Sequence, residues 1–224
     1  MGSEDLFHQR RASSHRKLDR KKAKRDAYAR VLIVCEGEKT EPNYLRELID
    51  HLKLNSANVE VDGRCGSSPD SIWGYAKKCC QEEVKKGDAY DRVYCVFDRD
   101  SHTTYDATVA AIHSAKPKGR YYVITSVPCF EYWLLLHYEF STRPYNRTGR
   151  SSPCDCIIEE LKGKGYLPDY SKGDSGVFAQ IIGETNRAIA NSKRALHHAK
   201  RADTDNPTTL MHNLVEYLQN LKQR

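Results

Sequence analysis

Residues 31–52 read VLIVCEGEKTEPNYLRELIDHL and contain the pattern that decides the fold. The continuous apolar run at 31–35 is typical of a strand that is covered on both faces of a parallel sheet. Thr40, Glu41 and Pro42 then predict the start of a helix, because Thr caps a helix N-terminus, an acid suits the first turn, and Pro lacks the N–H that would be left unpaired there. The buried face of this helix is expected to consist of Leu45, Leu48, Ile49 and Leu52.

Strand and helix patterns continue to alternate along the chain. Runs rich in β-branched and aromatic residues predict further strands at 57–61, 92–97 and 121–126. The helices between and after them are expected at about 68–86, at about 104–114 and after Pro128. Because strands that alternate with helices usually pair in parallel, we expect an α/β fold with a mainly parallel four-stranded sheet flanked by helices.

After residue 140 the pattern changes. Residues 141–153 are rich in Ser, Thr, Pro, Arg and Gly, which is typical of a loop. Helices are predicted at about 154–163, 175–199 and 207–222. We therefore predict a basic N-terminal arm (1–30), an α/β domain (31–140) and a helical C-terminal extension (141–224) that packs on it.

The net charge of +6 is concentrated in the arm. Residues 10–30 contain ten Lys or Arg against two Asp, whereas residues 31–224 contain 26 basic and 26 acidic residues. Because each cation that reaches a phosphate releases a counterion, the arm predicts RNA or DNA as a partner; a solvated tail is the alternative. No run of about 18 apolar residues occurs, so we expect no membrane contact and a cytoplasmic location.

Four carboxylates follow the predicted strands. Glu36 comes directly after the first strand, Asp98 and Asp100 after the third, and Glu131 lies in the first helical turn after the fourth. The carboxyl ends of parallel strands meet at one edge of a sheet, where clustered acids raise one another's pKa. Mg²⁺ or Mn²⁺ would remove this repulsion and prefers oxygen ligands. The joint placement predicts a metal site, although each acid alone also suits a turn or a helix N-terminus.

The eight cysteines show no C-x-x-C spacing, so we expect no disulfide framework. Cys154 and Cys156 form a C-x-C pair, and His137 or the pair His197–His198 would be needed to complete a zinc site. This is a weak pattern, because C-x-C is a poor half of a tetrahedral site.

The motifs around the acids resemble those of known families. VCEGEKTE at 34–41 resembles the glutamate motif of Toprim domains, and VFDRD at 96–100 resembles their Asp-x-Asp motif. SVPCFEYWLLLH at 126–137, YSKGD at 170–174 and NPTTLMHNLV at 206–215 resemble segments of the RloB family, which is associated with phage defence. The resemblance extends from about residue 31 to residue 218.

This resemblance implies a Toprim-like fold and a metal-dependent nuclease, with antiphage defence as its role and an AAA-type ATPase as a partner. Glu36 then corresponds to the Toprim glutamate, a general acid/base or metal ligand. Asp98 and Asp100 correspond to the metal-binding pair, and Glu131 to the acid of the F-E-x-W segment. The alternative is a non-catalytic sensor or scaffold that binds a metal or nucleotide and serves a partner ATPase.

Phosphodiester hydrolysis also calls for a cation from the protein, because negative charge develops at the phosphorus-bound oxygens. Lys172, within YSKGD, is the first candidate for this role, and Lys39, in the loop after the first strand, is the second. Tyr170 is one of several tyrosines that we consider for stacking on bases.

Overall fold

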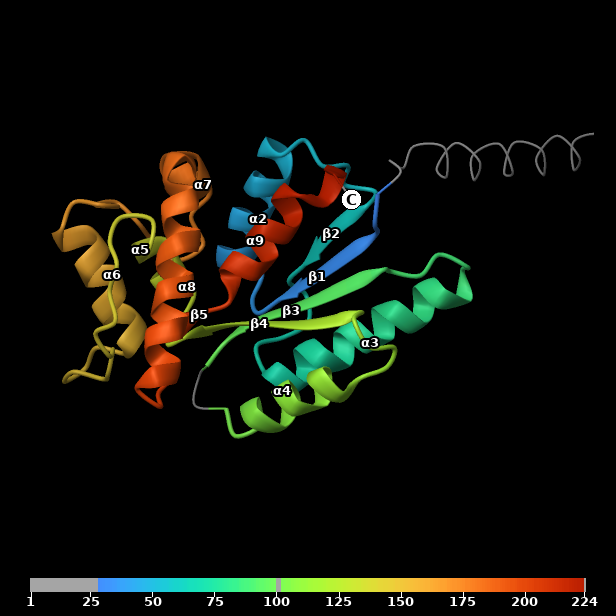
Figure 1. Cartoon of the computed structure of the whole chain (residues 1–224), viewed down its shortest axis with the longest axis horizontal. Coiled ribbons are helices and arrows are strands. Elements are labelled where there is room, and N and C mark those ends of the chain that lie inside the picture. The colour runs from blue at the N-terminus through green and yellow to red at the C-terminus, as the bar shows by residue number, and fades with distance from the viewer. Residues whose placement is uncertain (1–27, 100–101, 224) are drawn as a thin grey trace, which may run out of the picture.

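The computed structural model describes residues 28–99 and 102–223, and its centre is a five-stranded sheet with the order β2-β1-β3-β4-β5 (Figure 1). Its first four strands run parallel, and β5 is antiparallel to β4. The strands are β1 (Val31–Cys35), β2 (Val59–Asp62), β3 (Arg92–Asp98), β4 (Tyr121–Val127) and β5 (Thr208–Thr209). The sequence therefore predicted the mixed α/β class and the parallel strands correctly.

The strand order creates a switch point at the centre of the sheet. From β1 the chain moves to one side to form β2, and it then crosses to the other side of β1 to form β3 and β4. Crossovers on opposite sides of a strand leave a crevice beyond its carboxyl end, which is where ligands usually bind in such sheets. The switch point here lies between the ends of β1 and β3, which are in register at Cys35 and Val96.

Alternate residues of β1 pack into two different hydrophobic cores, one on each face of the sheet. Val31 and Ile33 pack on the face covered by α2 (Thr40–His51) and α9 (Met211–Gln219), whereas Leu32 and Val34 pack on the other face. That second face is covered by α3 (Pro69–Lys85) and α4 (Tyr105–Ser114) (Figure 1). Both faces of the strand are buried, which is the physical reason for the unbroken apolar run.

The remaining helices gather beyond the carboxyl ends of the parallel strands (Figure 1). They are α5 (Glu131–Leu135), α6 (Pro153–Gly163), α7 (Val177–Ile181) and α8 (Thr185–Arg201), with short 3₁₀ turns at Ile182–Glu184 and Leu221–Gln223. Trp133 and Leu161 share one hydrophobic cluster with Ile33, so this cluster contains residues from both sides of position 140. The division into domains at that position stays a prediction.

Three expectations about secondary structure are wrong. The sheet has five strands instead of four, because Thr208 and Thr209 pair with Val127 and Ser126. The last helix consequently starts at Met211 and not at residue 207. The helix expected at 175–199 is divided by the 3₁₀ turn at Ile182–Glu184. In each case a tertiary contact or a local turn prevails over the residue pattern.

The absence of disulfides was also predicted wrongly for one pair, since Cys129 and Cys154 are joined. Most of the basic arm lies outside the described residues, so its role in binding phosphate stays a prediction. Its last part is described, and the Arg30 side chain is 2.7 Å from the Glu83 carboxylate. Among the helices that the structure describes, none has the length and apolar character needed to cross a bilayer.

Candidate functional site

The ends of β1 and β3 hold the first two acids of the site. The backbone N–H of Glu36 donates to the Val96 carbonyl at 2.9 Å, which continues the β1–β3 ladder by one residue. The Glu36 carboxylate in turn accepts a 3.0 Å hydrogen bond from the backbone N–H of Asp98. Glu36 and Asp98 are thus fixed beside each other at the switch point of the sheet.

A third acid, Glu41, lies in the first turn of α2 and is only 6% exposed. Burial, together with the negative charges of Glu131 and Glu36, raises its pKa from the ordinary value of 4.5 to about 8. The Lys172 ammonium opposes this shift. Glu41 is therefore part of the same electrostatic cluster, although it comes from a different element than the predicted ligands.

Asp98 experiences the same environment. Part of the residue reaches solvent, but its carboxyl group is surrounded by protein, and this burial raises its pKa well above the ordinary 3.8. Negative charges nearby raise it further; they belong to Glu41, Glu131 and Glu36. A hydrogen bond from the Phe130 backbone acts in the opposite direction. Four carboxylates thus interact electrostatically, and for Asp98 and Glu41 the folded chain favours the protonated or cation-bound form.

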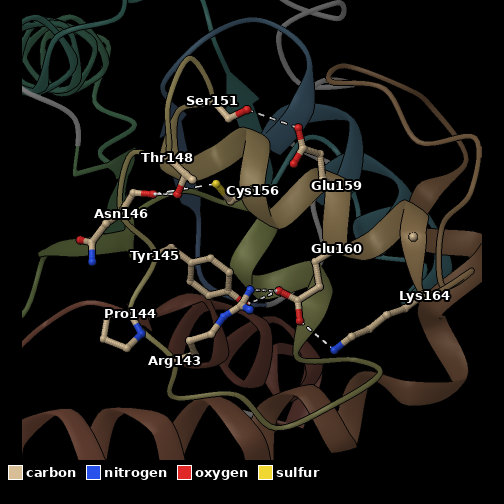
Figure 2. Close-up of a pocket in the computed structure, with 11 residues that line it drawn as sticks. Arg143, Pro144, Tyr145, Asn146, Thr148, Ser151, Cys156, Glu159, Glu160 and Lys164 are labelled. Atoms are coloured by element: carbon tan, nitrogen blue, oxygen red, sulfur yellow. Dashed lines mark hydrogen bonds and ion pairs between the residues drawn. The ribbon is translucent and has the colours of Figure 1, made fainter.

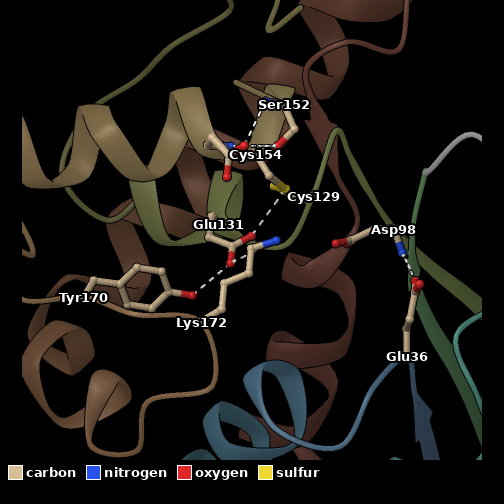
Figure 3. The surroundings of a disulfide bond; sticks show 9 residues. Glu36, Asp98, Cys129, Glu131, Ser152, Cys154, Tyr170 and Lys172 are labelled. Carbon is tan, nitrogen blue, oxygen red and sulfur yellow. Dashed lines mark hydrogen bonds and ion pairs between the residues drawn. A yellow bond between two sulfur atoms is a disulfide. The ribbon is translucent and has the colours of Figure 1, made fainter. Parts of the chain in front are cut away.

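Glu131 faces Asp98 from the other side of the site (Figure 3). It is the first residue of α5 and is 2% exposed. Its Oε1 accepts a 2.9 Å hydrogen bond from the Tyr170 hydroxyl and lies 4.0 Å from the Lys172 Nζ. Tyr170 is buried, so the structure does not support the expectation that it stacks on bases; it holds Glu131 instead.

Lys172 reaches the acids from a turn that is docked on α2. The backbone carbonyl of Gly173 accepts a 3.0 Å hydrogen bond from the Asn43 side chain. Gly173 has a positive φ of 87°, and a Cβ there would lie 3.0 Å from two carbons of the Lys39 side chain. Glycine is needed at this position for both reasons. The two lysines predicted as cations therefore lie on neighbouring loops, and Lys172 is the one that the structure pairs with an acid.

The 206–215 segment supports the same edge of the sheet. The Ser126 and Thr209 hydroxyls are 2.9 Å apart, and the Ser192 hydroxyl donates to the Thr209 carbonyl at 2.9 Å. Arg99, directly after Asp98, forms an ion pair with Asp205. The segment is thus structural support for the carboxyl end of β4 and for the chain that follows β3.

A comparison with protein families covers all the segments that contribute to this site. The family model described as RloB-like protein matches residues 31–218. The chain belongs to the RloB-like family. A comparison with curated proteins finds no match. In this RloB-like chain, the segments that carry the resemblance contribute Glu36, Asp98, Glu131 and Lys172 to one cluster.

Asp100 lies outside the described residues, and its role as a metal ligand stays a prediction. Sequence reasoning about the RloB-like site missed one acid that the structure describes. Glu41 was not among the predicted ligands, because an acid in a first helical turn has an ordinary explanation in the helix dipole. Its position at the end of the EGEKTE motif was the available signal.

The donor set suits the predicted metals. Carboxylate oxygens are the ligands that Mg²⁺ and Mn²⁺ prefer, and the raised pKa values of Asp98 and Glu41 show how costly their charges are without a nearby cation. Among the described residues, the acids that would hold such an ion are Glu36, Glu41, Asp98 and Glu131. No three of their carboxylates lie within 4.8 Å of one another, so side chains must move closer together to surround an ion. Binding of the ion itself stays a prediction.

A hollow of about 670 Å³ lies elsewhere, between α6 and the preceding loop (Figure 2). Its charged groups neutralise one another: the Glu160 carboxylate lies 2.5 Å from Arg143 and 2.7 Å from Lys164. It also accepts a 2.9 Å hydrogen bond from Tyr145. Since the hollow has no surplus of charge and no group with an unusual protonation state suited to catalysis, we place the candidate site of the RloB-like chain at the acid cluster.

Proposed function

We propose that this RloB-like chain is a Mg²⁺- or Mn²⁺-dependent nuclease that hydrolyses phosphodiester bonds of RNA or DNA. One observation carries the proposal: Glu36, Glu41, Asp98 and Glu131 interact electrostatically at the switch point of a parallel sheet, and the pKa values of Asp98 and Glu41 are raised. Such a cluster is costly unless a cation occupies it. A Toprim-like relationship and a role in antiphage defence are parts of the same proposal.

A bound divalent cation would supply charge neutralisation at the phosphoryl oxygens and a lowered pKa of bound water. The acids would hold such an ion, and Glu36 is the candidate for taking a proton from a water molecule. It is suited to this because its carboxylate is already oriented by the Asp98 N–H. Lys172, half-exposed and 4.0 Å from Glu131, is free to move its ammonium toward a phosphate that enters the site. Lys39 remains the second cation.

The partner belongs to the same proposal. Nucleic acid would approach along the basic arm, and the AAA-type ATPase would act on or with the nuclease. A nuclease that depends on the ATPase would show no cleavage when it is assayed alone. Cleavage of RNA and of DNA is therefore measured with Mg²⁺ or Mn²⁺, both with and without the ATPase.

The decisive variant is Asp98→Asn, which keeps the size of the side chain and removes its charge. We expect cleavage to fall by at least about 100-fold, the loss typical of removing one group that stabilises developing charge. Asp106→Asn is the matched control, because Asp106 is an exposed acid in the first turn of α4. Equal cleavage by wild type and Asp98→Asn would refute the proposal. No cleavage by the wild type under any of these conditions would favour the non-catalytic sensor or scaffold.

A further inference from the structure

Two sulfur atoms lie against the side of Glu131 that faces away from Tyr170. Cys129, in the connection between β4 and α5, is 1% exposed, and Cys154 is at the start of α6. The ligand atoms of Cys129, Glu131 and Cys154 all lie within 4.8 Å of one another. In the structure the two sulfurs are joined as a disulfide (Figure 3).

The two oxygens of Glu131 have unequal partners. Oε1 accepts from Tyr170 and lies near Lys172, whereas the neighbour of Oε2 is the Cys154 Sγ at 3.7 Å. A disulfide sulfur carries no hydrogen, so it cannot donate to this oxygen. Within residues 28–99 and 102–223, the structure gives Oε2 no N–H or O–H donor. A buried carboxylate oxygen in this condition is costly, and a thiol proton or a cation would relieve the cost.

The start of α6 adds a second favourable feature. Ser152 and Asp155 cap this helix reciprocally: the Asp155 N–H donates to the Ser152 hydroxyl at 3.2 Å, and the Ser152 N–H donates to the Asp155 carboxylate at 2.8 Å. Cys154 is the second residue of this well-formed helix. A helix N-terminus favours a thiolate over a thiol, and the thiolate is the form that binds metals.

We propose that the reduced chain binds Zn²⁺ through Cys129, Cys154 and Glu131. A dithiol reductant transfers two electrons and two protons to the disulfide, which gives two thiols and the oxidised form of the reductant. Binding of Zn²⁺ then displaces the two thiol protons, and two thiolates and one carboxylate surround the ion. Three protein ligands of this kind leave a fourth tetrahedral position for water or a substrate atom. Oxidation of the pair removes both sulfur ligands and releases the ion.

This site, with two sulfur ligands, differs from the all-carboxylate site that the nuclease proposal requires. It shares Glu131 with that site, but its existence does not depend on cleavage of any nucleic acid. Cys156 provides a matched control, because it lies on the same helix and contacts the Asn146 carbonyl at 3.8 Å instead of Glu131. Figure 2 shows Cys156 on the side of α6 that faces the separate hollow.

The test uses the full chain, reduced with a dithiol, freed from the reductant and kept without oxygen. Titration with Co²⁺ should give the thiolate-to-cobalt charge-transfer absorption of one ion per chain, and Zn²⁺ should abolish it. Cys129→Ser or Cys154→Ser should remove this absorption, and Cys156→Ser should keep it. Glu131→Gln should weaken Zn²⁺ binding at least about tenfold, a loss that even outer-shell partners of a metal produce. Protein oxidised with a disulfide reagent should show no absorption.

A second measurement needs no variant and therefore covers the case that a serine variant does not fold. In the reduced wild type, Zn²⁺ should protect the partly exposed Cys154 from alkylation, mapped by mass spectrometry, and should leave the partly exposed Cys156 reactive. The inference is overturned if the reduced wild type gives no thiolate–cobalt absorption. Absorption that survives in a folded Cys129→Ser variant, or protection of other cysteines only, overturns it as well.

Discussion

Replacement of Glu41 by glutamine tests the charge balance of the acid cluster directly. Glu41 is buried at the start of α2, and its pKa of about 8 means that the folded chain favours the protonated carboxyl. Between pH 4.5 and pH 8 the folded state therefore binds more protons at Glu41 than the unfolded state does. Stability of the metal-free wild type must then fall as the pH rises through this window.

The size of the effect follows from the two pKa values. A difference of one between folded and unfolded pKa corresponds to about 1.4 kcal/mol, so the change from 4.5 to about 8 costs up to about 4 kcal/mol at pH 8. Glutamine has no charge to bury, but its amide group can lose a hydrogen bond worth about 1 to 3 kcal/mol. We expect Glu41→Gln to be more stable than the wild type by about 1 to 3 kcal/mol at pH 8. At pH 4.5 the charge cost is small, so we expect the variant to be less stable by up to about 3 kcal/mol and the two curves to cross.

Thermal and urea unfolding in a chelator, from pH 4.5 to pH 8.5, measures both curves. For a chain of this length, 1 kcal/mol corresponds to about 2 to 4 °C in Tm. Asp50→Asn is the matched control, because Asp50 is an exposed acid of the same helix and should leave the pH profile unchanged. Parallel curves for wild type and Glu41→Gln across the whole window would refute the reasoning, since the cost of the Glu41 charge would then be absent.

Three further predictions concern the frame around the site. Gly63→Ala should lower the free energy of unfolding, measured with urea, by about 1 to 3 kcal/mol. The reason is that its Cβ would lie 2.1 Å from the Gly37 carbonyl oxygen in the loop after Glu36. Tyr170→Phe should lower the free energy of unfolding by about 1 to 3 kcal/mol, because the buried Glu131 loses its hydroxyl donor. Removal of residues 1–27 should weaken binding to RNA or DNA. It should also reduce the slope of the logarithm of the binding constant against the logarithm of the salt concentration, by about 0.9 for each lost phosphate contact.

Each of these predictions has a control in the same chain. Gly74→Ala adds a Cβ with no atom within 4 Å inside α3 and should not destabilise the protein. Tyr166→Phe removes a hydroxyl bonded to Glu139 outside the acid cluster and should affect neither the site nor its metal binding. Full salt dependence after removal of the arm would show that phosphate contacts come from the folded part. Unchanged stability of Gly63→Ala or Tyr170→Phe would contradict the close contacts on which those two predictions depend.

The sequence predicted strands and helices well where the pattern is local. Runs rich in apolar and β-branched residues located the four parallel strands to within about two residues, because strands buried on both faces consist mainly of such residues. The pattern failed at Thr208–Thr209, where Asn206 and Pro207 resemble a helix start. The pairing of these threonines with β4 depends on a strand about 80 positions earlier. No local pattern contains that information.

The site shows the same division between local and distant causes. The positions of Glu36 and Asp98 follow from strand ends and parallel pairing, so the sequence predicted that they meet. The surroundings of Glu41 include a distant part of the chain, because the turn around Gly173 docks on α2 and the charge of Lys172 acts on Glu41. Tyr170 was likewise considered as a surface residue, whereas its hydroxyl holds Glu131 in the interior. Packing between remote segments decided these two roles.

Protons and cations compete for the same oxygens of the acid cluster, which links its pH dependence to its metal binding. Lys172 is the one ammonium that the described residues place within 4.0 Å of these acids, and it is half-exposed. The raised pKa values of Asp98 and Glu41 show that it does not offset the burial of these two carboxyls, whose charge is removed by protonation or would be neutralised by a divalent ion. The pH range in which the metal-free chain loses stability is therefore the range in which cation binding must strengthen. Because protons and cations compete for the same carboxylate oxygens, the free energy of unfolding should fall toward pH 8 without metal and should stay constant over this range with metal.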